Sequence, residues 1–140
     1  MTTIHADALI EAHCTLARRF FAEQDRLRGG PAADLCAADY RACLGGNPPM
    51  DRAGHEAFAQ AFYAAFDGIQ HTLVDVFGTP DRVAVRFVLE GTHTGAFFGV
   101  PSSGRPVSIV ANVILHVENG KVTKVFGLFD EAGLFRQIAA

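Results

Sequence analysis

The chain has 140 residues, of which 49% are apolar and 19% charged, and its formal net charge is −3. This length suits one domain with a substantial core, so we expect a single domain over residues 1–140. Lysine and arginine are scattered singly or in pairs such as Arg18-Arg19. The chain therefore has no basic footprint for a phosphate backbone, which argues against nucleic-acid binding. No uncharged apolar stretch reaches the ~20 residues that cross a bilayer, so we expect no membrane contact.

The first residues, Met1 to His5, lack the basic region and apolar run of a signal peptide, which favours a cytoplasmic protein. The three cysteines are odd in number and fit neither C-x-x-C nor zinc spacing, so we interpret Cys14, Cys36 and Cys43 as reduced, buried thiols. Four histidines show no ligand spacing with a carboxylate or cysteine, so we expect no metal site: His5, His13, His55 and His71.

The first half of the chain predicts helices. Apolar residues recur at helical spacing from Asp7 to Leu27, and Arg28-Gly29-Gly30-Pro31 ends that pattern. A helical turn over 32–38, a short strand over 40–44 and a loop over 45–49 follow. Asp51 is placed to N-cap a second helix that ends near Gly68, with a phenylalanine stripe that we interpret mainly as core packing.

The second half predicts strands. Residues 73–77 and 83–90 flank a turn at 78–81, and the alternation of the second strand places His93 on its apolar side. A glycine-rich connection over 95–104 leads into a long hairpin over 107–130. The last element is a short helix over 131–138. Helices followed by antiparallel strands indicate an α+β domain with the helices packed on one face of a curved sheet.

The hairpin turns at Asn119-Gly120, the strongest short-range hairpin signal, because a type I′ turn needs positive φ at both central positions. A two-residue loop with regular alternation pairs Val117 with Val122 and Ile109 with Asp130 on one apolar face. The intervening pairs on that face are Leu115 with Lys124, Val113 with Phe126 and Ala111 with Leu128. The predicted interior face of the hairpin therefore ends in the Asp130 carboxylate.

The opposite face of the hairpin is mixed, and the same register leaves four apolar side chains on it: Val110, Ile114, Val125 and Phe129. A patch of this kind is larger than monomers usually tolerate, so we expect a homodimer.

Several strings resemble the SnoaL-like polyketide cyclases of the nuclear transport factor 2 superfamily: GTHTGAFFGVPSSGR (91–105), the ENGKV turn, FGLFDEAGLFRQI (126–138) and GGNPPMDRAG (45–54). The resemblance covers nearly the whole chain. It implies a cone-shaped, curved antiparallel sheet with helices on its concave face, a cystatin-like arrangement, and a pocket that needs no cofactor. It also implies a homodimer formed through the outer face of the sheet.

In this family, the resemblance implies, an aspartate in the pocket acts as acid and base for an intramolecular aldol closure, assisted by histidine. The matching residues here are Asp130, the candidate base, and His93, the candidate donor or proton shuttle. Burial among apolar side chains would raise the pKa of Asp130 toward a useful range. The alternative is that Asp130 only N-caps the last helix, which would lower its pKa. Phe126 stands where the family often has tryptophan.

The expected pocket is lined by seven residues: Tyr40, Phe20, Phe58, Phe62, Leu89, Val113 and Phe126. Phenylalanine walls with few polar groups suit a small, flat, hydrophobic molecule. We therefore expect a cofactor-free cyclase or isomerase acting on a polyketide-like carbonyl compound. Two alternatives stay open, namely a hydrolase on the same scaffold, as in the limonene epoxide hydrolases, and a binding module without catalysis.

Overall fold

The computed structural model describes residues 3–139. Its elements along the chain are α1 (Thr3–Leu27), the 3-10 turn η1 (Ala33–Leu35), β1 (Cys36–Leu44), α2 (Arg52–Ala65), β2 (Phe66–Thr79), β3 (Arg82–His93), β4 (Pro106–Glu118), β5 (Lys121–Phe129) and α3 (Glu131–Ala139).

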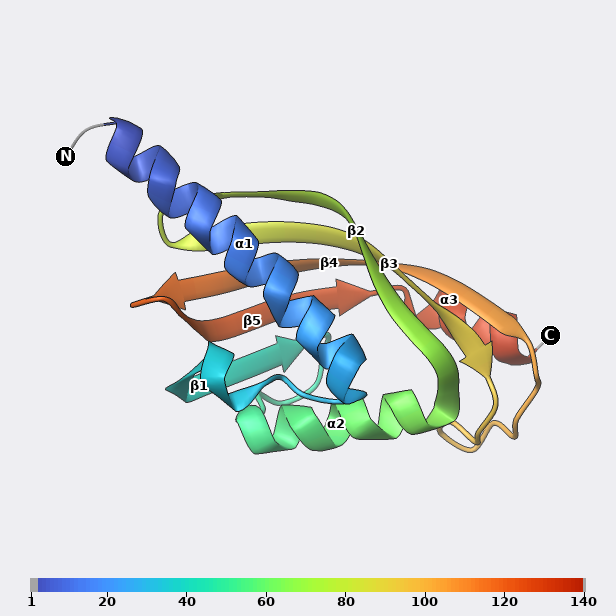
Figure 1. The fold of residues 1–140 in the computed structure, drawn as a ribbon. Helices are drawn as coiled ribbons and strands as arrows, with labels where there is room; N and C mark the ends of the chain where they lie inside the picture. The colour runs from blue at the N-terminus through green and yellow to red at the C-terminus, as the bar shows by residue number, and fades with distance from the viewer. Residues whose placement is uncertain (1–2, 140) are drawn as a thin grey trace.

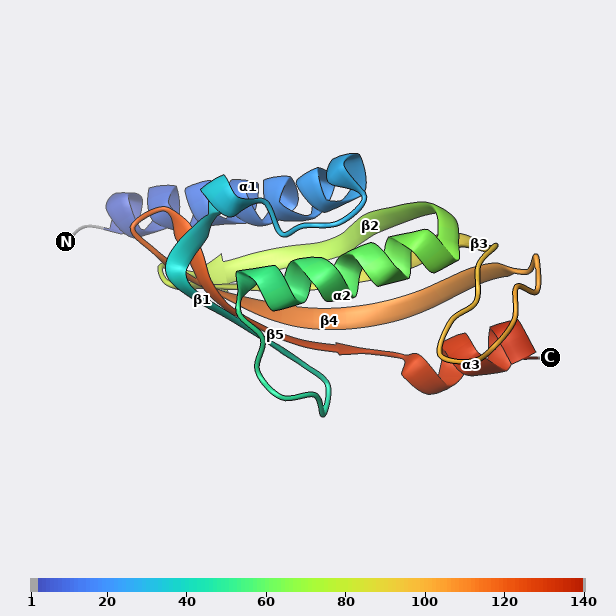
Figure 2. The same cartoon turned by 90° about the horizontal axis from the view of Figure 1, so that it is seen from below.

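The five strands form one curved sheet in the order β1-β5-β4-β3-β2. Helices α1 and α2 lie side by side across its concave face, and α3 sits at one end of β4 and β5 (Figures 1 and 2). The expected α+β class, with helices on the concave face, is confirmed. The sheet is mixed rather than wholly antiparallel, because β1 pairs with β5 in parallel.

Several element boundaries differ from the sequence prediction. The helical turn expected over 32–38 is shorter, because β1 already begins at Cys36. Helix α2 ends at Ala65, and Phe66 and Asp67 instead open β2, where they pair with His93 and Thr92. The carbonyl of Ala65 accepts hydrogen bonds from the backbone N–H groups after β3, which fixes this early end. At the start of α2 the prediction is confirmed, since Asp51 accepts a hydrogen bond from the Gly54 N–H at 2.8 Å.

The core lies between the two helices and the concave face. Phe20 of α1, Phe66 of β2 and Leu115 of β4 are fully buried there, together with Val83 and Val122. Alternate residues of β3 and β4 point into this layer, as period-2 burial along both strands shows.

The hairpin register is correct at the turn and wrong beyond it. Asn119 (φ 50°) and Gly120 (φ 73°) have the positive φ of a type I′ turn, and Val117 pairs with Val122 as predicted. The next pair, however, is His116 with Lys124, so Thr123 is an extra residue that forms a β-bulge. Every later residue of β5 therefore faces the side opposite to the one predicted.

Gly127 shows why the shifted register fits the concave face. It points inward between β1 and β4, and a Cβ atom at this position would lie 2.9 Å from Val113 Cγ1 and 3.2 Å from Leu44 Cδ2. Glycine thus allows β1 to approach β5, and its carbonyl accepts a hydrogen bond from the Gly45 N–H at 2.8 Å.

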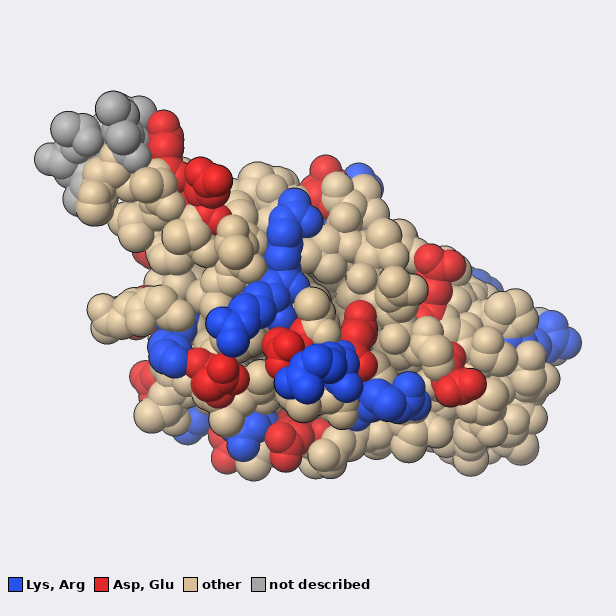
Figure 3. All heavy atoms as spheres, viewed as in Figure 1, with Lys and Arg blue, Asp and Glu red and all other residues tan. Residues whose placement is uncertain are grey.

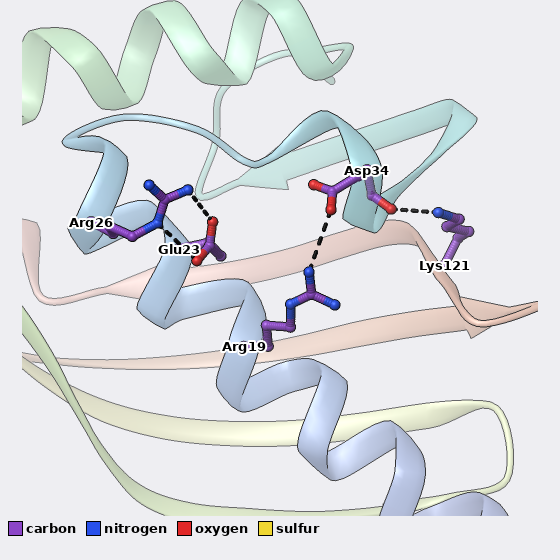
Figure 4. A network of polar contacts seen from close by, with 5 residues as sticks. All are labelled: Arg19, Glu23, Arg26, Asp34 and Lys121. Atoms are coloured by element: carbon purple, nitrogen blue, oxygen red, sulfur yellow. Dashed lines mark hydrogen bonds and ion pairs between the residues drawn. The ribbon is translucent and has the colours of Figure 1, made fainter.

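The surface over α1 carries both signs of charge. Red and blue side chains are interspersed on the face that Figure 3 shows. In the network of Figure 4, Arg19 pairs with Asp34 at 3.4 Å, Arg26 pairs with Glu23 at 2.7 Å, and Lys121 donates to the Asp34 carbonyl. Exposed pairs contribute at most about 1 kcal/mol each, so the Arg19–Asp34 pair orients η1 against α1 more than it stabilises the fold.

Candidate active site

A cavity of about 110 Å³ lies between α1, α2 and the concave face of the sheet. Its walls are mostly aromatic and aliphatic, and they include five residues of the predicted pocket: Phe20, Phe58, Phe62, Leu89 and Val113. A cavity of about 150 Å³ admits benzene, so this space can hold about one aromatic ring. The rest of a larger ligand would have to lie outside the cavity. The polar groups of the lining include two histidines, His55 and His71.

His71 is held by a carboxylate from the last turns of α1. Its Nδ1 lies 2.7 Å from Asp25 Oδ1, and its backbone N–H donates to Asp25 Oδ2 at 2.9 Å. The His71 ring packs between Phe21 and Phe87, with ring centroids 5.3 and 4.8 Å away. Both the position and the orientation of the imidazole are therefore fixed.

The same carboxylate accepts a third hydrogen bond, from the Tyr63 hydroxyl of α2, at 2.6 Å to Oδ1. Burial opposes ionisation of Asp25, but the hydrogen bonds from His71 and Tyr63 outweigh it, so the pKa of Asp25 lies below its ordinary value. Burial, together with the hydrogen bond to Asp25, raises the pKa of Tyr63. Asp25 is thus a carboxylate, and Tyr63 a phenol, at neutral pH.

These contacts assign the tautomer of His71. A carboxylate only accepts hydrogen bonds, so Nδ1 carries the proton and Nε2 of the neutral ring has a free lone pair. Among residues 3–139 no hydrogen bond engages Nε2, and the ring lines the cavity. The Asp25–His71 pair therefore presents a proton acceptor to whatever occupies the cavity.

The pair also borders the outer surface. Asp25 and His71 line a second, shallow depression between α1 and β2, together with Arg18, Arg26 and Gln70. The side chains of His71 and Asp25 are 9% and 22% exposed, so neither is sealed from water.

The second cavity histidine has a different partner. His55, from the first turns of α2, lies with Nδ1 2.8 Å from the hydroxyl of Tyr40, and the two rings are stacked at an interplanar angle of 5°. Burial lowers the pKa of His55 to about 4 and raises the pKa of Tyr40. Tyr40 was predicted in the pocket wall, but it stands behind His55.

Asp130 does not face the cavity, and the expectation that it ends the interior face of the hairpin is wrong. The bulge at Thr123 turns it outward, where it is exposed, and its backbone N–H donates to the Val110 carbonyl at 3.0 Å. Its Oδ1 accepts a hydrogen bond from the Gly133 N–H at 2.9 Å. Asp130 is therefore the N-cap of α3, as the alternative interpretation held.

The same shift moves Phe126 out of the pocket wall. Its ring contacts that of His116 at a tilt on the outer face and is 42% exposed, whereas Val125 and Phe129 line the cavity in its place. Val110 and Ile114 lie on the outer face of the hairpin as predicted, but Phe126 and Leu128 take the places expected for Val125 and Phe129.

His93 is buried, as its place on the apolar side of β3 predicts, but it lies outside the cavity lining. Its Nδ1 accepts from the Ser103 N–H at 3.2 Å and contacts the Ser103 hydroxyl at 2.8 Å. Its ring packs on Phe66 with centroids 5.2 Å apart. These contacts anchor the glycine-rich connection to the end of β3.

The sequence contained weak signals for the pair that was missed. Asp25 lies four residues after Phe21, on the stripe of α1 that faces the core. His71 follows Ile69 by two residues, so it shares an inward face of β2. A polar residue at a core position of each element was the clue, but 46 positions separate the two partners along the chain.

Neither a metal-binding cluster nor a membrane-spanning helix is found among the described residues. No cluster of three or more His, Cys, Asp or Glu side chains within 3–139 is arranged to hold a metal ion. No helix in that part of the chain is long and apolar enough to cross a membrane.

The chain is similar to a known protein family and to several solved structures. The family model of the SnoaL-like polyketide cyclases matches residues 15–138. A candidate SnoaL-like polyketide cyclase from Jannaschia sp. CCS1 superposes with a TM-score of 0.83 at 19% identity, covering 94% of each chain. IdmH from Streptomyces antibioticus, a candidate polyketide cyclase, superposes with a TM-score of 0.74 at 26% identity, covering 93% of this chain and 97% of its own.

A third structure names the fold. A Catenulispora acidiphila protein with a ketosteroid isomerase-like fold superposes with a TM-score of 0.74 at 14% identity, covering 89% of this chain and 92% of its own. The fold is therefore ketosteroid isomerase-like, the nuclear transport factor 2-like arrangement that the sequence resemblance implied. No match was found among curated protein sequences.

Proposed function

Because the chain belongs to the SnoaL-like polyketide cyclase family, we propose that it catalyses cofactor-free acid–base chemistry on a flat, hydrophobic carbonyl compound. The reaction is an aldol cyclisation or an isomerisation that begins with removal of a proton α to a carbonyl. The observation that carries the proposal is the Asp25–His71 pair, which sits in the wall of a mostly apolar cavity.

His71 is the base in this proposal. Its Nε2 takes the α proton, which leaves an imidazolium and an enolate, while Asp25 holds the ring in the required tautomer and stabilises the cation. In a cyclisation the enolate carbon then bonds to a second carbonyl carbon, and the new alkoxide takes the proton back from Nε2. In an isomerisation the proton returns to a different carbon. Atoms and charge balance in both cases, and no other reactant is needed.

The aromatic walls supply the substrate class. Phe21 and Phe87 flank the imidazole, and Phe58 and Phe62 of α2 lie in the same lining. Such walls favour a planar ring system, and they exclude much of the water that would compete for the enolate.

Exchange at the α carbon of 2-tetralone, an enolisable planar ketone, tests the proposal without the natural substrate. The protein in D₂O should speed loss of the α-proton signal, measured by NMR, and His71→Gln should reduce that acceleration by about 10²-fold or more. Asp130→Asn is the matched control, because it keeps the helix cap and lies outside the cavity. A wild-type protein that binds 2-tetralone without accelerating exchange would favour the binding module instead.

We further propose that two copies associate through the outer face of β4 and β5. The apolar side chains of Val110, Ile114, Phe126 and Leu128 support this, since they are 42–69% exposed and adjacent. Analytical ultracentrifugation should show a dimer at micromolar concentration, and Ile114→Lys, which lies outside the cavity lining, should shift it toward monomer. A wild-type monomer at that concentration would contradict the proposal.

A further inference from the structure

The Tyr40–His55 pair is a second polar feature of the cavity, and the base mechanism leaves it without a role. Tyr40 of β1 is 1% exposed and His55 of α2 is 6% exposed. The position of the histidine follows from the start of α2, where Asp51 caps the helix and its carbonyl accepts the His55 N–H at 2.9 Å. The ring is thus held both by its backbone and by the Tyr40 hydroxyl.

The partner of Nδ1 sets the tautomer of His55. A phenol is a far stronger acid than a neutral imidazole N–H, so the Tyr40 O–H donates and Nδ1 accepts. The ring proton of neutral His55 then resides on Nε2. Within residues 3–139 no acceptor engages Nε2, and the ring lines the cavity. Burial, which lowers the pKa of His55 to about 4, keeps the ring in this neutral form.

We propose that His55 is a permanent hydrogen-bond donor that recognises an acceptor oxygen of the cavity ligand, with Tyr40 as its positioning residue. The oxygen is a ketone carbonyl in the bound ligand and an enolate oxygen after proton loss. This inference rests on the proposed function for the cavity and ligand class, but it does not require that any proton be transferred. The proposal restricts the ligand to planar compounds whose carbonyl oxygen can reach Nε2 of His55 on α2.

An N–H that faces the cavity and has no partner in the protein favours a ligand that satisfies it over an isostere that does not. Acetophenone and α-methylstyrene form such a pair, because one carries a carbonyl oxygen where the other carries a methylene. The preference of the wild-type protein for acetophenone should fall about two- to tenfold when His55 is replaced by phenylalanine, the range expected for one neutral hydrogen bond.

The experiment is an NMR titration of each probe into wild-type, His55→Phe and Tyr40→Phe proteins. His116→Gln is the matched control, because His116 lies on the outer face of β4. We expect the affinity for α-methylstyrene to change little in His55→Phe while the affinity for acetophenone drops. Tyr40→Phe should lower the preference as well. A wild-type protein that binds the two probes equally, or binds neither, overturns the proposal.

A second measurement begins with the wild-type protein alone. Long-range ¹H–¹⁵N spectra of the wild-type protein should place the His55 proton on Nε2 and show a neutral ring from pH 8 to 5. In Tyr40→Phe the same spectra should show a mixture of tautomers, which a merely structural tyrosine would not produce. A proton on Nδ1, or titration near pH 6.5, overturns the proposal. Loss of 2-tetralone exchange with the probe preference intact would contradict only the base mechanism.

Discussion

The two cavity histidines differ in what holds Nδ1, and that difference divides the chemistry between them. His71 faces a carboxylate, which accepts from Nδ1 and leaves Nε2 as a base. His55 faces a phenol, which donates to Nδ1 and leaves Nε2 as a donor. In the same cavity, His71 thus offers a hydrogen-bond acceptor and His55 a hydrogen-bond donor. The residue behind a histidine, rather than the histidine itself, sets its role.

The largest effect on exchange is expected when His71, like His55, has an uncharged partner at Nδ1. Asp25→Asn gives His71 a neutral partner and removes the charge that stabilises the imidazolium. We expect the acceleration of 2-tetralone exchange to fall by about 10²-fold or more. NMR exchange rates, with thermal melting to confirm that the variant is folded, measure this. Exchange within threefold of wild type would remove the carboxylate from the mechanism.

Tyr63→Phe tests the third partner of the carboxylate. It removes the hydroxyl that donates to Asp25 Oδ1 at 2.6 Å but leaves both hydrogen bonds from His71. A hydrogen bond to a charged group contributes about 2 kcal/mol, so we expect a loss of that size in the free energy of unfolding. Urea titration at pH 7 measures it. Exchange should change less than in Asp25→Asn, and an equal loss would mean that the tyrosine itself takes part in proton transfer.

The pH dependence of the free energy of unfolding tests the state of the other histidine, His55. The pKa of His55 falls from an ordinary value near 6.5 to about 4 on folding, so below pH 6.5 the unfolded chain binds a proton that the folded chain does not. Stability contributed by His55 is therefore complete above pH 6.5 and declines as the pH falls. We expect a loss of about 1.5 kcal/mol between pH 6.5 and 5.

His55→Gln should flatten that decline while lowering stability at every pH. Urea unfolding at half-unit steps from pH 7.5 to 5 separates the two effects, because only the slope reports the titration of His55. Identical slopes for the variant and the wild type would show that His55 is not buried in its neutral form.

The smallest effect is expected at Asp130, outside both histidine sites. Replacing it with alanine removes the cap of α3 and should cost about 1 kcal/mol, whereas asparagine should cost little. Thermal melts measure both, and neither variant should alter 2-tetralone exchange. A large loss of exchange in Asp130→Asn would restore Asp130 to the mechanism.

Local patterns were sufficient to predict much of the fold. Helical spacing in α1, the cap at Asp51 and the turn at Asn119-Gly120 each depend on residues within a few positions of one another. The aromatic side chains of α1 and α2 that line the cavity follow from the same helical periodicity. Properties of this kind are fixed by neighbours in the chain, and sequence alone carries them.

The features that failed depend on contacts between distant segments. Both faces of β5 are apolar, with Val125 and Phe129 inside and Phe126 and Leu128 outside, so alternation could not reveal the bulge. That single residue decided where Asp130 points. The Asp25–His71 contact joins a helix to a strand, and nothing in either segment specifies the other.

The single extra residue at Thr123 reverses the face of the sheet on which every later side chain of β5 lies. If Thr123 instead paired with His116, without the bulge, Phe126, Leu128 and Asp130 would lie on the concave side and Val125 and Phe129 would be exposed. The cavity wall and the outer patch would exchange residues without a substitution. Functional residues at the end of this strand therefore cannot be assigned across the family by counting from the hairpin turn, and an alignment is meaningful here only once each member's bulge has been located.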